Sequence, residues 1–119
     1  MIGNQDEIRL RPRSNSIDGA RGAIIDKGIE DWASVRRECL ENAYGLIFQV
    51  GAKGFQLDER AKDDEIAAYC RDNGCDLFTP DTTFYKGFFA AKVKTVRLTS
   101  YDWWKKRYIF KIEIDAQSI

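Results

Sequence analysis

The stretch DDEIAAYCRDNGCDLFTPDTTF, residues 63–84, predicts a helix that runs directly into a buried strand. Asp63 opens the helix, and the pair Asn73-Gly74 closes it, because glycine readily takes the left-handed backbone found just after a helix. The apolar run 75–79 predicts the strand, and a Thr-Pro-Asp turn follows it. One carboxylate therefore stands at each end of this unit, Asp63 before the helix and Asp81 after the strand.

The preceding segments repeat the alternation of strand and helix. Residues 22–26 predict a short buried strand that ends in Asp26, and residues 46–50 predict a second apolar strand. Asp31 suits the N-cap of a helix over 32–44 between them. The expected buried stripe of that helix is Trp32, Val35, Cys39, Leu40 and Ala43. Strands that alternate with helices predict an α/β fold with a small, mostly parallel sheet flanked by helices.

The C-terminal third predicts two further strands. One covers residues 93–99, and the other covers 107–115, where apolar and charged side chains alternate in a pattern typical of a half-exposed strand at a sheet edge. An exposed edge strand can also pair with a strand of a partner protein. Residues 86–89 read as an exposed apolar loop that could serve a homodimer interface.

Length and composition predict one folded domain over residues 22–119, preceded by a polar, basic arm or frayed terminus over 1–21. The 119 residues carry 19 basic and 19 acidic side chains, so nucleic-acid binding would have to come from a local patch rather than from net charge. No apolar run is long enough to span a membrane and no signal peptide is evident, so a cytoplasmic protein is expected.

The absence of histidine restricts the chemistry further. It excludes Ser-His and Cys-His nucleophiles and histidine-bound zinc, so a metal site would have to use carboxylates, which favour Mg²⁺ or Mn²⁺. The three cysteines, Cys39, Cys70 and Cys75, fall in apolar segments without metal-binding spacing, and we expect buried, reduced thiols.

Three aspartates are expected to meet at one edge of the sheet. Asp26 and Asp81 follow the carboxyl ends of predicted strands, and Asp63 begins a helix that must run back antiparallel to the sheet. Clustered carboxylates repel one another and need cations between them, as in sites where a metal activates water to hydrolyse a phosphodiester. Read singly, Asp63 is a helix cap, while Asp26 and Asp81 are turn residues.

The order and spacing of these residues resemble the PIN-domain nucleases. The pattern Asp63-x-x-Ile66 followed by Thr79-x-Asp81-x-x-Phe84 is similar to the latter half of that family, and residues 22–26 are similar to its first strand. The sixteen-residue spacing from Asp63 to Thr79 resembles the toxin-type members of the family, and the short distance from Asp26 to Asp63 resembles its compact, reduced forms. The resemblance implies a PIN-like α/β domain over residues 22–119, with Mg²⁺- or Mn²⁺-dependent ribonuclease activity.

The same resemblance implies roles for individual residues and partners. Asp26, Asp63 and Asp81 would be catalytic metal ligands. A fourth acid on an intermediate helix would be Glu38 or Glu41. Both lie on the expected exposed face of that helix and could simply be solvated. RNA would be the substrate, and toxin-type members commonly dimerise and are inhibited by an antitoxin. A non-catalytic PIN-like binding module, or an unrelated α/β interaction protein, are the alternative interpretations.

A basic and aromatic cluster in the C-terminal third could hold nucleic acid. Trp103 and Trp104 are expected to begin the last strand, where they could stack bases or simply bury apolar area. The candidate phosphate-binding residues are Lys92, Lys94, Arg97, Lys105, Lys106 and Arg107.

Overall fold

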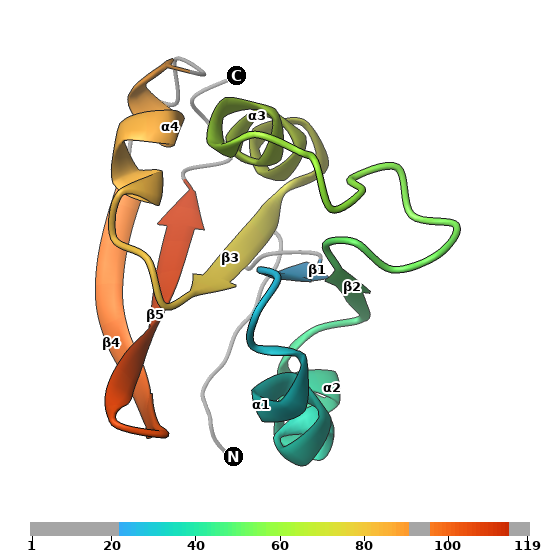
Figure 1. Cartoon of the computed structure of the whole chain (residues 1–119), viewed down its shortest axis with the longest axis vertical. Coiled ribbons are helices and arrows are strands. Elements are labelled where there is room, and N and C mark those ends of the chain that lie inside the picture. The colour runs from blue at the N-terminus through green and yellow to red at the C-terminus, as the bar shows by residue number, and fades with distance from the viewer. Residues whose placement is uncertain (1–21, 91–95, 115–119) are drawn as a thin grey trace.

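The computed structural model describes residues 22–90 and 96–114, which form a five-stranded mixed sheet with helices on both faces (Figure 1). The predicted N-terminal arm, residues 1–21, lies outside the described residues. The strand order across the sheet is β2-β1-β3-β5-β4. The elements are β1 (Gly22–Ile25), α1 (Glu30–Val35), α2 (Arg37–Ala43), β2 (Leu46–Gln49), α3 (Asp63–Asn73), β3 (Cys75–Thr79), α4 (Phe84–Ala90), β4 (Val96–Trp104) and β5 (Arg107–Ile114).

The first half of the sheet is parallel, as the alternation of strands and helices predicts. Strand β1 pairs in parallel with β2 on one side and with β3 on the other. All four residues of β1 and all five of β3 are buried, because helices cover both faces of these strands. The predicted bounds of β1, β2 and β3 agree with the structure to within one residue.

The second half of the sheet is an antiparallel hairpin, so the sheet is mixed rather than mostly parallel. Strand β5 pairs with both β3 and β4, and β4 is the edge strand on this side of the sheet. The prediction that residues 107–115 form the edge strand is therefore wrong. The charged side chains that suggested an edge pair with each other: Lys111 and Glu113 are each less than a quarter exposed. Lys111 Nζ lies 3.3 Å from Glu113 Oε2. With β5 in the interior, it cannot pair with a partner strand.

The predicted helix over 32–44 is divided into two short helices at Arg36. Asp31 is accordingly not the N-cap but lies in the first turn of α1. The break also changes which side chains face the sheet: Trp32 and Leu40 are fully buried, but Val35 is 59% exposed. Cys39 and Ala43 are exposed too, so the expectation of three buried cysteines holds only for Cys70 and Cys75.

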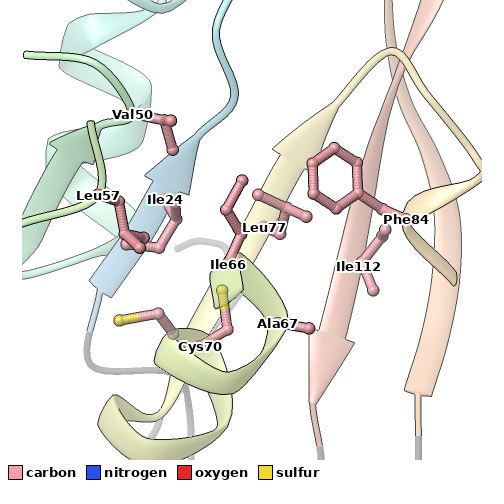
Figure 2. Packing of buried hydrophobic residues seen from close by; sticks show 10 residues of the cluster. Ile24, Val50, Leu57, Ile66, Ala67, Cys70, Leu77, Phe84 and Ile112 are labelled. Carbon is pink, nitrogen blue, oxygen red and sulfur yellow. The ribbon is translucent and has the colours of Figure 1, made fainter. Parts of the chain in front are cut away.

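Two apolar cores lie on opposite faces of the sheet. Helix α3 and the start of α4 cover one face, where Ile66 and Phe84 pack with Leu77 and Ile112 (Figure 2). Helices α1 and α2 cover the other face, where Trp32 packs against other buried side chains. In the part of the chain that the structure describes, no helix has the length and apolar character needed to cross a membrane.

Helix α4 occupies the segment that was predicted to be an apolar loop, and it packs against the start of α3. Gly87 makes this close approach possible. A Cβ atom at Gly87 would lie 3.0 Å from the backbone oxygen of Asp63 and 3.1 Å from its Cβ. The first turn of α3, with its candidate functional aspartate, is therefore held directly against α4.

Candidate carboxylate site

Asp26 follows the last residue of β1 and is held by both neighbouring strands. Its backbone N–H donates to the Phe78 carbonyl at 2.9 Å, which extends the pairing with β3. The Gln49 side-chain amide donates to the Asp26 carbonyl at 3.1 Å from the end of β2. Asp26 is only 6% exposed. This carboxylate is therefore fixed at the carboxyl end of the parallel strands, where ligands bind in α/β folds.

The Asp26 carboxylate is hydrogen-bonded through both oxygens. The Thr79 hydroxyl donates to Oδ2 at 2.7 Å, and the Lys27 backbone N–H donates to Oδ1 at 2.8 Å. Burial raises the pKa of Asp26 above its ordinary value, and the nearby Asp63 adds to that rise. The two hydrogen bonds and the charge of Lys27 oppose the rise without cancelling it.

Asp81 is connected to Asp26 through the same threonine. The Asp81 backbone N–H donates to Thr79 Oγ1 at 3.0 Å, so this hydroxyl bridges the two aspartates. Asp81 Oδ1 accepts from the backbone N–H and hydroxyl of Thr83, at 2.9 Å and 2.7 Å. No described residue donates to Oδ2 of this exposed side chain. The turn residue predicted from Thr-Pro-Asp thus keeps one carboxylate oxygen available.

Asp63 is the first residue of α3 rather than its N-cap, which is Lys62. At the N-terminus of α3, the Glu65 side chain accepts a hydrogen bond from the Lys62 backbone N–H at 2.8 Å. Burial of the carboxyl raises the pKa of Asp63, the charge of Asp81 raises it further, and Lys27 lowers it. Among the described residues, none donates a hydrogen bond to the Asp63 carboxylate.

Lys27 is a functional candidate that the sequence analysis did not single out. Its ammonium group lowers the pKa of both Asp26 and Asp63, so it lies within electrostatic reach of the two carboxylates. The same group donates to the Glu59 carbonyl at 2.5 Å. The sequence feature that could have indicated Lys27 is its place directly after Asp26, the residue that ends the predicted strand.

The three predicted ligands gather at one edge but do not form a single coordination shell. Within residues 22–90 and 96–114, no three carboxylate or thiolate side chains converge closely enough to hold a metal ion together. Mg²⁺, however, usually binds through one or two carboxylates and keeps several waters. Asp63 and Asp81 fit such a site because the charge of Asp81 adds to the rise that burial causes in the pKa of Asp63, and both retain oxygens without donors among the described residues.

Glu38 is not brought to this edge. It is exposed on α2, which packs on the sheet face opposite α3. Glu41, the other candidate, forms an ion pair with Arg37 at 2.9 Å on the same helix. The predicted fourth acid is therefore missing from the arrangement of the described residues.

Two hollows on the described surface are lined by other residues. One, of about 400 Å³, is lined by the loop before α3 and by α3 itself, including Leu57 and Tyr69. The other, of about 250 Å³, lies beside Ile25 and α1. Neither hollow is lined by Asp26, Asp63 or Asp81.

The predicted phosphate-binding residues are divided between the two ends of the β4–β5 hairpin. Arg97 lies at the end away from the turn and forms an ion pair with Glu113. At the turn, Lys105 pairs with Asp31, and Arg107 donates to the Gly28 carbonyl at 3.1 Å. Lys92 and Lys94 lie outside the described residues. Trp103 and Trp104 end β4 rather than begin the last strand.

Comparison with protein-family models, curated proteins and solved structures gives no match for this chain. The PIN-like family assignment therefore stays a prediction from the sequence pattern.

Proposed function

We propose that this protein is a PIN-like ribonuclease that uses Mg²⁺ or Mn²⁺ bound at Asp63 and Asp81, with Asp26 beside them. The observation that carries the proposal is the position of Asp63. Burial raises the pKa of Asp63, and the charge of Asp81 raises it further. The charge of Asp63 in turn adds to the rise that burial causes in the pKa of Asp26, and no described residue donates a hydrogen bond to the Asp63 oxygens. Repulsive carboxylates with open oxygens favour a divalent cation.

The residues around the carboxylates have distinct supporting roles in this proposal. Thr79 holds Asp26 through its hydroxyl and holds the backbone of Asp81 through the same oxygen. Lys27 places a positive charge near Asp26 and Asp63, where it can attract the phosphate of an RNA strand. A bound divalent ion would supply an activated water and neutralise charge on the phosphate.

The test is metal-dependent cleavage of labelled RNA by the full-length protein. We expect cleavage in Mg²⁺ or Mn²⁺, its loss in EDTA, and its loss in both Asp63→Asn and Asp81→Asn. Asp58→Asn is the matched control, because Asp58 is an exposed aspartate whose carboxylate accepts from the nearby Arg60 backbone. Wild-type cleavage rates in both site variants would contradict the assignment.

A second candidate function is a non-catalytic module that binds RNA or an antitoxin-like protein through the same fold. The observation that favours this candidate is that protein groups already satisfy the Asp26 carboxylate. Both of its oxygens accept hydrogen bonds, and Lys27 supplies a positive charge beside it. This candidate predicts RNA binding without turnover at any metal concentration. It also predicts that metal leaves the melting temperature unchanged.

A further inference from the structure

The end of the β4–β5 hairpin exposes a pair of large aromatic side chains. Trp103 is 57% exposed and Tyr108 is 50% exposed, and the two residues face each other across the hairpin. Their ring centroids are 4.8 Å apart at an angle of 72°, and Phe110 continues the row at 6.1 Å from Tyr108. Aromatic area of this kind is usually buried, so its exposure needs an explanation.

The aromatic pair lies on the same face of the sheet as the carboxylate site. Phe110 is paired with Thr79 across β5 and β3, so their side chains share a face, and Tyr108 follows two residues along on that face. Figure 1 shows the hairpin turn extending past the end of β3. From a strand spacing of about 4.8 Å, Tyr108 is roughly 12 Å from Asp26.

The turn beside these rings presents cations on a strained backbone. Lys105 and Lys106 both have positive φ angles, 49° and 69°, where hairpins normally use Asn-Gly. Positive φ is unfavourable for lysine, so the choice of lysine at both positions does not serve folding. Lys106 is exposed and forms no ion pair within the part of the chain that the structure describes.

Arg107 connects this turn to the loop that leaves the carboxylate site. Its guanidinium donates to the carbonyl of Gly28, two residues after Asp26. Lys105 reaches Asp31 at the start of α1, so two contacts fasten the turn to the β1–α1 segment. Because Arg107 pairs with Trp104, which packs against the core under α1 and α2, these two contacts lie on the sheet face opposite Trp103 and Tyr108. Lys106 is the turn cation that neither contact engages.

We propose that Trp103 and Tyr108 stack the bases of a single-stranded nucleic acid whose phosphates contact Lys106 at the turn. Stacking on aromatic faces with phosphates held by cations is how proteins bind single strands without sequence preference. A duplex would fit poorly, since its base faces are covered by their neighbours. That this nucleic acid continues toward Asp63 and Asp81 is a further step that rests on the proposed function. The stacking on Trp103 and Tyr108 does not rest on it.

The test is fluorescence anisotropy of labelled oligouridine RNA with the full-length protein in EDTA, where metal-dependent cleavage cannot occur. We expect Trp103→Ala and Tyr108→Ala each to weaken binding by about 5- to 150-fold, the range for loss of one stacked base. Trp103→Phe and Tyr108→Phe should retain most of the affinity. Leu46→Ala is the matched control, because Leu46 is 53% exposed on the opposite edge strand, β2.

Two further arms sharpen the result. Oligothymidine DNA distinguishes a general single-strand site from one that prefers RNA, and duplex RNA should compete weakly. The inference is overturned if wild type does not bind either single strand, if both alanine variants bind like wild type, or if the duplex binds equally well. Dimerisation that these same variants abolish would also overturn it, by assigning the surface to a second copy. Binding in EDTA without cleavage in metal would contradict only the proposed function.

Discussion

The hydroxyl of Thr79 lies 2.7 Å from Oδ2 of Asp26, joining residues 53 positions apart at the carboxyl ends of adjacent strands. Both groups are buried, with Thr79 fully so and Asp26 6% exposed. The same hydroxyl accepts from the backbone N–H of Asp81. One side chain therefore determines how two of the three candidate aspartates are placed.

Replacing this hydroxyl should destabilise the fold. In Thr79→Val the shape is kept but Asp26 loses a donor, and a hydrogen bond to a charged group contributes about 1.5–3 kcal/mol. Urea unfolding should show a loss in that range, and Thr79→Ser should recover part of it. Thr99→Val is the control, since Thr99 is exposed on β4 and its change should stay within about 0.5 kcal/mol. A similarly small effect of Thr79→Val would contradict the bridging role.

The buried carboxylate should reduce stability at neutral pH. Burial raises the folded-state pKa of Asp26 above its ordinary value of 3.8, so the folded state holds the proton more tightly than the unfolded state. The free energy of unfolding therefore falls as pH rises from about 3.8 through the raised pKa. In EDTA, Asp26→Asn should melt at a higher temperature than wild type near neutral pH.

That difference should shrink as the pH is lowered toward 3.8, because the wild-type carboxyl then becomes neutral as well. Melting curves across this range measure the effect directly, with Asp58→Asn as an exposed control. A variant that is less stable than wild type at neutral pH would show that Asp26 is a net stabilising charge. Burial of the ionised Asp26 carboxylate would then not cost the fold stability.

Gly87 should resist replacement by alanine although it lies inside a helix. Alanine normally favours a helix by up to about 1 kcal/mol over glycine. Here its Cβ would press on the backbone of Asp63 at 3.0 Å, and the first turn of α3 has little room to shift. We expect the melting temperature of Gly87→Ala to stay level or fall. A clear rise would mean that α3 and α4 are less tightly joined than their contacts indicate.

Much of the parallel half of the sheet could be predicted from local signals. The run 75–79 is apolar and bounded by Asn73-Gly74 and Pro80, and Gly74 does take the left-handed conformation that ends α3. These signals depend on neighbours in the chain, so one sequence is enough to find them. The places of Asp26 and Asp81 after the carboxyl ends of β1 and β3 followed from the same strand and helix order.

The antiparallel half depended on contacts that no local pattern encodes. Lys111 and Glu113 satisfy one another inside the sheet, which makes an interior strand look like an edge in the sequence. The hairpin turn uses Lys105-Lys106 in place of a recognisable turn pair, so its position was missed. The break between α1 and α2 falls at Arg36, whose side chain binds Asp102, a residue distant in the sequence.

The contacts around the three aspartates could not be predicted from the sequence. The roles of Lys27 and Thr79 depend on which oxygens they approach in space, and spacing along the chain carries no such information. The fourth acid could not be located because Glu38 and Glu41 have similar places in the sequence pattern. The structure directs both away from the carboxylate edge.

The most direct test of the account is thermal melting of the full-length protein with Mn²⁺ or Mg²⁺ added. An ion that binds only the folded state stabilises it by about 2.7 kcal/mol at a hundredfold excess over Kd. We predict that the melting temperature of wild type and of Glu38→Gln rises with metal, while that of Asp81→Asn does not. No rise in wild type, or an equal rise in Asp81→Asn, would contradict a metal site at Asp63 and Asp81.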